Sequence, residues 1–169
     1  MKITRRTAFI FITIILTIAA DQISKALVRT YVEAGSSSPI IGNILQLMNV
    51  ENDGAFLGMG GDLNPTLKLI LLLILPVVVL GLVLRHVIKD KSLDRWSLFA
   101  FASIIGGGIA NVYDRFAYGS VTDFLYIRIT DVIRTGIFNL ADLSVTTGMI
   151  ILVVMMFKKK ENRKTTKRI

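Results

Sequence analysis

The stretch LKLILLLILPVVVLGLVL, residues 67–84, contains a single ionisable side chain, Lys68. A helix rises about 1.5 Å per residue, so this stretch extends about 27 Å and nearly crosses the hydrocarbon core of a bilayer. An apolar run of this length with one lysine near its start is typical of a transmembrane helix. The chain is therefore predicted to be an integral membrane protein.

Three more stretches have a similar length and composition: residues 8–28, 96–113 and 137–157. Each is long enough to cross the membrane as a helix. The prediction is a membrane α-helical protein with four transmembrane helices, in which residues 1–169 form one integral-membrane domain.

Basic residues are concentrated in three of the segments outside these stretches. Residues 1–7, 85–95 and 158–169 hold 14 of the 20 lysines and arginines, with three acidic residues. Because cytoplasmic loops carry this excess, both termini and the basic tail at 158–169 are predicted to be cytoplasmic. The segments 30–66 and 114–136 would then lie outside the cell membrane.

The outer segments are expected to form a small extracytoplasmic β-sheet at the membrane surface. Residues 125–130 alternate between apolar and polar or aromatic side chains, which is typical of a strand, and residues 44–49 show a weaker alternation. The sequence Gly35-Ser36-Ser37-Ser38-Pro39 predicts a turn or flexible stretch. Two short strands are therefore expected.

The composition excludes several kinds of chemistry. The chain has no cysteine, which excludes disulfides and thiolate chemistry, and its one histidine, His86, lies in a predicted cytoplasmic loop. Neither a Ser-His pair nor a histidine metal site is then expected on the outer side, and no cofactor or metal is predicted. The net charge of +8 does not indicate nucleic acid, because the basic tail follows a predicted span as a stop-transfer anchor does.

Acidic side chains remain as candidates for catalysis. Two carboxylates that share one proton can activate a water for attack on an amide and protonate the leaving group. Asp142 is the strongest candidate because it lies inside the fourth stretch, about 8 Å beyond Ile137, with Asn139 on the same helical face. Its partner is either Asp114, beside Arg115, or Asp123. Asp123 is preferred because the apolar residues that follow it would favour a protonated carboxyl.

Other interpretations of the acidic residues remain open. Asp21 and Lys25 have the i,i+4 spacing of an ion pair that could simply fix the first helix. Asp114 near Asn111 could be a polar cap on the third helix. A proton- or cation-coupled transporter is an alternative function, because membrane acids also form ion relays. A non-catalytic scaffold that binds lipidated peptides is another.

The chain resembles lipoprotein signal peptidase, also called signal peptidase II, a family of bacterial membrane aspartyl proteases. Five motifs in the family's order carry the resemblance: Asp21-Gln22-Ile23-Ser24-Lys25, Asn52-Asp53-Gly54-Ala55-Phe56, Asn111-Val112-Tyr113-Asp114-Arg115, Val121-Thr122-Asp123-Phe124 and Phe138-Asn139-Leu140-Ala141-Asp142. Each motif alone is a weak signal, but five in order with matching spans are specific.

The resemblance implies a role for each candidate residue. Asp123 and Asp142 would form the catalytic pair. Four residues would position the substrate or this pair: Asn52, Gly54, Arg115 and Asn139. Four more would support the site: Asp21, Lys25, Asn111 and Asp114.

The resemblance also implies the substrate and the location. The substrate would be a prolipoprotein that carries a diacylglyceryl-modified cysteine, and the enzyme would cut the amide just before that cysteine. The site would face the outer side of the bacterial cytoplasmic (inner) membrane. The other expected partners are membrane lipids, and the chain is expected to be a monomer.

Overall fold

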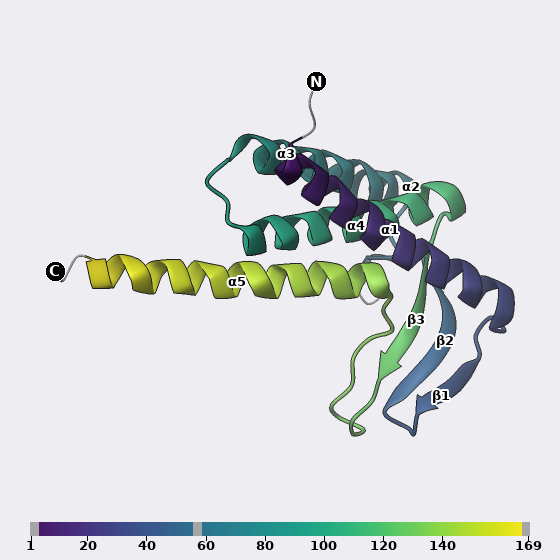
Figure 1. Ribbon diagram of the computed structural model, residues 1–169. Helices are drawn as coiled ribbons and strands as arrows, with labels where there is room; N and C mark the ends of the chain where they lie inside the picture. The colour runs from purple at the N-terminus through teal and green to yellow at the C-terminus, as the bar shows by residue number, and fades with distance from the viewer. Residues whose placement is uncertain (1–3, 56–58, 167–169) are drawn as a thin grey trace.

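The computed structural model describes residues 4–55 and 59–166, and at residues 159–166 it describes the helix backbone alone. Figure 1 shows a bundle of helices with a small sheet at one end. The elements are α1 (Arg5–Tyr31), β1 (Ser37–Ile41), β2 (Leu45–Asn52), α2 (Pro65–Lys68), the π-helical η2 (Leu69–Ile74), α3 (Leu75–Lys89), α4 (Arg95–Tyr118), β3 (Val121–Ile127) and α5 (Leu140–Thr166).

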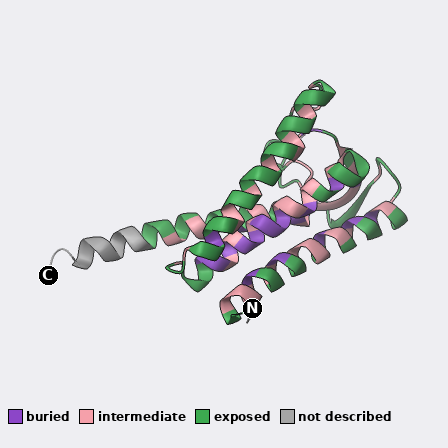
Figure 2. Ribbon diagram, turned by 90° about the horizontal axis from the view of Figure 1, so that it is seen from above, coloured by how far each residue is buried: buried purple, intermediate pink, exposed green. Residues whose placement is uncertain are grey.

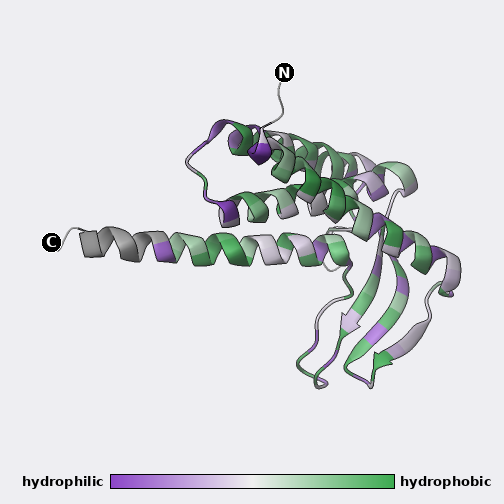
Figure 3. Ribbon diagram, in the orientation of Figure 1, coloured by the Kyte–Doolittle hydropathy of each residue, from purple (hydrophilic) through white to green (hydrophobic). Residues whose placement is uncertain are grey.

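The predicted fold class is confirmed in its architecture. Four helices of the described chain are long and apolar enough to cross a membrane: Arg5–Tyr31, Pro65–Lys89, Arg95–Tyr118 and Leu140–Lys158. The second of these combines α2, η2 and α3 into one span. Figure 3 shows the helices mainly green along their length, with purple hydrophilic residues in the loop between α3 and α4 and in the sheet.

The helix α4 is the centre of the bundle. Half of its most apolar window is buried, whereas the corresponding shares are 17% for α1, 11% for α5 and none for the second span. Figure 2 shows the buried residues concentrated on the central helix, while its neighbours are exposed over most of their surface. The three outer helices therefore present their apolar side chains to lipid.

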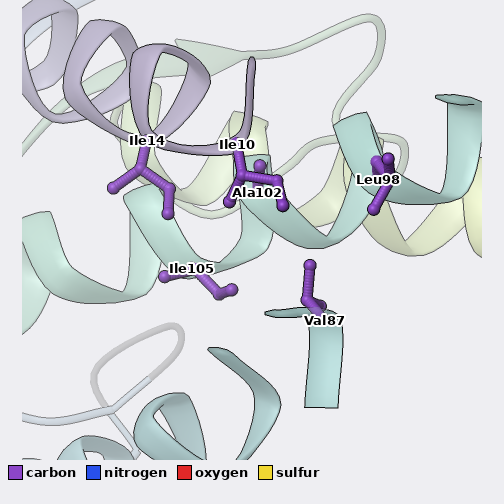
Figure 4. Packing of buried hydrophobic residues seen from close by; sticks show 6 residues of the cluster. All are labelled: Ile10, Ile14, Val87, Leu98, Ala102 and Ile105. Carbon is purple, nitrogen blue, oxygen red and sulfur yellow. The ribbon is translucent and has the colours of Figure 1, made fainter. Parts of the chain in front are cut away.

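A hydrophobic core joins α1, α3 and α4 at the end of the bundle near the N-terminus (Figure 4). It consists of Ile10 and Ile14 from α1, Val87 from α3, and Leu98, Ala102 and Ile105 from α4. The opposite end of α4 is polar and lies beside the sheet. The bundle thus has an apolar half and a half that can carry chemistry.

Three consecutive glycines let α4 approach three neighbours. Successive residues of a helix point about 100° apart, so Gly106, Gly107 and Gly108 face different sides. An added Cβ at Gly106 would lie 3.0 Å from the Ile14 carbonyl oxygen of α1, and one at Gly108 would lie 2.6 Å from Leu80 of α3. One at Gly107 would clash with the Ala141 carbonyl oxygen of α5. These glycines therefore allow α4 to pack closely against three neighbouring helices.

Replacement of Gly107 by alanine should destabilise the protein by about 1–3 kcal/mol, because a backbone atom has to move to admit the methyl group. The shift would displace the first turn of α5 and should lower activity as well. Gly81→Ala is the matched control, since nothing lies within 4 Å of a Cβ at that helical position. Thermal unfolding in detergent measures the stability of both variants. Equal melting temperatures for the two variants would contradict the close approach.

Pro76 interrupts the second span in a defined way. A proline has no N–H to donate to the carbonyl four residues earlier, and its ring clashes with that carbonyl. The chain responds with the π-helical turn η2, which directly precedes α3 and its Pro76. The helical hydrogen bonding therefore changes over residues 69–74, just before the proline.

The sheet is antiparallel, with the order β1-β2-β3. It has three strands where two were expected, because residues 37–41 form β1 instead of a flexible stretch. Ser37, Ser38 and Pro39 pair with residues 48, 47 and 46 of β2. Every residue of β1 is exposed, so its sequence carries no alternation that would reveal a strand.

The segment before α5 returns to β3. Phe138 donates its N–H to the Leu125 carbonyl at 2.9 Å, and its own carbonyl accepts from the N–H groups of Phe124 and Leu125 at 3.0 and 2.8 Å. These bonds hold residue 138 in an extended conformation. The helix therefore begins at Leu140, three residues after the predicted start of the fourth span.

Candidate active site

The structure brings the preferred aspartates to one place at the sheet end of the bundle. Asp123 lies on β3 and Asp142 lies in the first turn of α5. The return of the chain along β3 places Asn139, which precedes α5, beside Asp123. Side chains that are far apart in the sequence therefore meet because the segment before α5 is hydrogen-bonded to β3.

The strand register selects the neighbours of Asp123. Val50 of β2 lies opposite Asp123, so Asn52, two residues further on, shares its face. The Asn52 Nδ2 donates to Asp123 Oδ2 at 2.9 Å. Thr122 projects to the other face of β3, where its hydroxyl donates to Glu51 at 2.7 Å. The strand period therefore separates the site from the opposite face of the sheet.

Asn139 and Asp142 form a capping box at the start of α5. The Asp142 N–H donates to Asn139 Oδ1 at 2.9 Å, and the Asn139 N–H donates to Asp142 Oδ2 at 3.2 Å. This reciprocal pair satisfies two N–H groups that a helix start leaves unpaired. The remaining Nδ2 of Asn139 donates to Asp123 Oδ1 at 2.6 Å. One asparagine side chain therefore connects both aspartates.

Asn111 of α4 makes a second bridge. Its Nδ2 donates to Asp142 Oδ1 at 2.8 Å, and its Oδ1 accepts from Lys25 Nζ at 2.8 Å and from Asn139 Nδ2 at 3.2 Å. Because an ammonium can only donate, Lys25 fixes which end of the Asn111 amide faces Asp142. Lys25 thus orients the Asn111 amide donor toward the site without contacting Asp123 or Asp142.

Lys25 is fully buried between two carboxylates. Its Nζ lies 2.7 Å from Asp21 Oδ2 and 2.8 Å from Asp114 Oδ2, and neither acid is exposed. The other oxygen of Asp21 accepts from the Ala141 N–H of α5 at 2.8 Å. The expected Asp21–Lys25 pair is therefore present, and it also holds the start of the helix that carries Asp142.

Asp114 and Arg115 face different sides of α4. Asp114 does not cap this helix, which continues to Tyr118, so that interpretation is wrong. Instead it faces α1 and contacts Lys25 and Arg29, the latter at 3.3 Å. Arg115 points away from it and donates to the Gly54 carbonyl at 2.8 Å. Helical neighbours point about 100° apart, so adjacency in sequence did not mean contact.

The loop after β2 covers the site. Asn52 Oδ1 accepts from the Gly54 N–H at 3.0 Å, and its Nδ2 also reaches the Ala55 carbonyl at 3.2 Å. Arg115 ties the same loop to α4 through Gly54, while Lys68 pairs with Asp53 at 2.7 Å. Phe56, the last residue of the motif that begins at Asn52, lies outside the described residues.

Two cavities meet at this loop. The smaller has a volume of about 20 Å³ and is lined by Asn52, Ala55, Asn111, Arg115, Val121, Asp123, Ile137 and Asp142. A volume of this size accommodates about one water molecule. The larger, of about 750 Å³, runs along α5 from Asp142 to Val154 and has Leu71, Leu72 and Pro76 of the second span on its other side.

Three residues near the site were missed in the sequence. Gln22 donates to Asp114 Oδ1 at 2.9 Å, Arg29 donates to the Thr122 hydroxyl at 2.7 Å, and Glu51 accepts from that hydroxyl. The spacing of Asp21, Lys25 and Arg29, four residues apart on one helical face, was an available signal for Arg29. Gln22 lies inside the first motif but was given no role, and no comparable pattern marks Glu51.

The described residues contain no group of three histidine, aspartate or glutamate side chains placed to hold a metal ion. The two aspartates are instead surrounded by amide donors. Independence from metals remains a prediction for experiment.

Burial raises the pKa of Asp123 from 3.8 to about 6, and the negative charge of Asp142 acts in the same direction. The native carboxyl then binds its proton more tightly than the unfolded one, so stability falls as the pH rises from about 4 to 6. The loss is complete about one pH unit above the native pKa and amounts to at most about 3 kcal/mol.

Asp123→Asn should therefore gain stability relative to the unmodified protein as the pH rises from 4 to 8. The melting temperatures of both proteins in detergent, measured across this range, test the expectation. A difference in melting temperature that stays constant with pH would show that the pKa of Asp123 is not raised in the folded protein. The comparison depends on the trend, so a hydrogen bond lost by the asparagine at all pH values does not affect it.

The sequence is similar to that of proteins with assigned families. A family model described as Signal peptidase (SPase) II matches residues 13–158. The lipoprotein signal peptidase of Moorella thermoacetica (strain ATCC 39073 / JCM 9320) is 36% identical over 138 residues, which cover 82% of this chain and 85% of the relative. That of Borrelia duttonii (strain Ly) is 34% identical over 150 residues, or 86% of each chain.

Solved structures agree with the fold. A bacterial membrane enzyme determined by the in meso method at 2.3 Å resolution matches with a TM-score of 0.80 and 26% identity over 90% of both chains. A second, determined at 1.9 Å, matches with a TM-score of 0.76 and 24% identity over 88% of this chain and 92% of the other. The resemblance drawn from five motifs is confirmed, and the chain belongs to the signal peptidase II family of membrane peptidases.

Proposed function

We propose that this protein is an aspartyl endopeptidase that removes signal peptides from prolipoproteins, cutting just before a diacylglyceryl-modified cysteine. The observation that carries the proposal is the small cavity that Asp123 and Asp142 line together. Asn139 bonds to both aspartates, so their relative position is set by the fold. The family relationship supports the substrate class.

The proposed reaction uses one water and two carboxyl groups. One carboxylate accepts a proton from the water, whose oxygen attacks the scissile carbonyl carbon. The other carboxyl is protonated and donates its proton to the leaving nitrogen as the C–N bond breaks. After the reaction the first carboxyl holds the proton taken from the water and the second is ionised, so the pair again shares one proton for the next cycle. The apparent pKa values of such a reaction belong to the pair.

The amide network has a defined task in this reaction. Asn52, Asn111 and Asn139 direct N–H donors at the aspartates and so fix the directions of their oxygens. Preorganised donors stabilise charge without reorganising during the reaction. The Arg115 guanidinium lines both cavities and adds a positive charge where the tetrahedral oxyanion would form.

The larger groove supports a lipid-modified substrate. From Asp142 to Val154 it follows α5 for about 18 Å at helical rise. Its lining along α5 and the second span is mainly aliphatic, and it lies between two helices that face lipid. An acyl chain or the apolar part of a signal peptide could enter it from the side. The scissile bond would then reach Asp142 at the polar end.

The proposed orientation places the sheet and the site outside the bacterial cytoplasmic membrane, with both termini inside. The distribution of basic residues supports it, because residues 1–7, 85–95 and 158–169 lie at or beyond the other ends of the spans. A monomer suffices for the proposed reaction, since one chain supplies both aspartates. The polar groups gather at one end of the bundle, opposite the apolar core, which favours a peptidase over an ion relay.

Cleavage of a lipid-modified precursor by the purified protein in liposomes tests the proposed function. The expected product is a peptide that ends just before the modified cysteine, identified by mass spectrometry. A precursor without the diacylglyceryl group is the matched control and should be cut much more slowly. Cleavage should continue with a chelator present. Failure to cut the modified precursor, or dependence on a divalent metal, would contradict the proposal.

A further inference from the structure

A further cavity lies at the other end of α4, away from the candidate active site. Its volume is about 450 Å³, and Phe9 of α1 lines it together with Arg95, Trp96 and Phe99 at the start of α4. Arg95 and Asn111 are sixteen residues apart on this helix, which places the cavity about 24 Å from the candidate active site. The two sites therefore share no residue.

Arg95 supplies a positive charge at the edge of this cavity. Its guanidinium carbon lies 5.4 Å from the centre of the Phe9 ring, a cation–π arrangement. Within the described part of the chain, no carboxylate lies within 4.0 Å of the Arg95 nitrogens. The nearby Asp94 directs its carboxylate at its own helix, where the N–H groups of Trp96 and Ser97 donate to it. The charge of Arg95 is thus not neutralised locally.

The surroundings distinguish Arg95 from other basic residues at this end. Arg6 is held by the Val87 and Asp90 carbonyls at the end of α3, at 2.7 and 2.6 Å, and is engaged within the protein. Arg5 precedes Phe9 by four residues and therefore lies on the same face of α1 as the cavity lining. Trp96 is 64% exposed at the point where α4 enters the membrane. Tryptophan at that depth is typical of the headgroup region.

We propose that this cavity binds an anionic phospholipid in the leaflet next to the basic loops. The phosphate contacts Arg95, an acyl chain lies along Phe9 and Phe99, and Trp96 lies beside the glycerol region. Charge complementarity selects an anionic headgroup, because a zwitterionic lipid would bring a positive group to the same arginine. Basic pockets between transmembrane helices recognise lipid headgroups in this way.

The chain contains its own probe for this site. Trp96 is its one tryptophan, so quenching of tryptophan fluorescence reports lipid contact at this residue. The protein is reconstituted into phosphatidylcholine vesicles that contain a minor fraction of phosphatidylglycerol. In one series the phosphatidylglycerol carries brominated chains. In the other series, an equal amount of the phosphatidylcholine carries the brominated chains instead.

Brominated phosphatidylglycerol is expected to quench Trp96 as if it were about fivefold enriched at the cavity, the effect of one arginine near an anionic lipid. Arg95→Gln should remove the preference. Lys91→Gln, which changes a basic residue of the loop before α4 that does not line the cavity, should keep it.

Four results would overturn the proposal. Equal quenching by the two lipids in the unmodified protein would exclude selection, and this comparison needs no variant to fold. A preference that survives Arg95→Gln would exclude the assigned contact. An equal loss in Lys91→Gln would show attraction by the whole basic surface instead of a site. Weak quenching by both lipids would indicate that a second copy of the chain covers Trp96. None of these measurements depends on peptidase activity.

Discussion

Asp142→Asn should lower kcat/KM for cleavage of a lipid-modified precursor by at least about 10²- to 10⁴-fold, the contribution of a positioned acid or base. Asparagine has nearly the same shape but cannot take a proton from water. Asp123→Asn should cause a loss of the same order, because both carboxyl groups line the cavity where the water would lie. The double variant should be little worse than either single one, since the two groups act as a unit.

Initial rates with purified proteins in liposomes measure these effects. Asp131→Asn is the matched control, because this aspartate lies in the loop after β3, is exposed, and pairs with Arg128 instead of a site residue. It should retain full activity. Each inactive variant must still unfold cooperatively in detergent, which separates lost chemistry from lost structure. Substantial cleavage by Asp142→Asn or by Asp123→Asn would remove that residue from the proposed mechanism.

Lys25→Met should destabilise the protein by about 3–5 kcal/mol, the usual consequence of removing one partner from a buried ion pair. Lys25 is fully buried and contacts the carboxylates of Asp21 and Asp114. Its loss would leave two acids near each other with Arg29 as the remaining cation, 3.3 Å from Asp114. It would also free the Asn111 amide to turn its oxygen toward Asp142, which would lower activity further.

Chemical unfolding in detergent measures the stability of this variant. Lys91→Met is a suitable control, because this lysine is exposed in the loop between α3 and α4. The double variant Asp21→Asn, Lys25→Met should recover part of the loss, since it removes one of the two uncompensated charges. A Lys25→Met protein as stable as the Lys91→Met control would show that the ion pairs contribute little.

The sequence predicted those features that depend on local composition. Four spans follow from apolar length, because lipid imposes the same requirement on each helix. The shared location of Asp123 and Asp142 could also be anticipated, from an acid placed in a span and from motif order. Their catalytic role stays a prediction, as does the orientation of the chain in the membrane.

What the sequence did not reveal depends on contacts between distant segments. The strand β1 exists through pairing with β2 and has no apolar alternation of its own. The late start of α5 depends on Phe138 bonding to Leu125. The partners of Asp114 depend on which side of α4 meets α1. Each of these outcomes is decided by geometry that residue order alone does not contain.

The backbone pairing of Phe138 with β3 restricts how the enzyme can open. Because β3 and the start of α5 are joined there, Asp123 and Asp142 must move together. The opposite wall of the large groove is formed by the second span, which has no buried residue in its most apolar window and a π-helical turn beside Pro76. The groove is therefore expected to widen for a bulky substrate through movement of the second span, while Asp123 and Asp142 keep their positions.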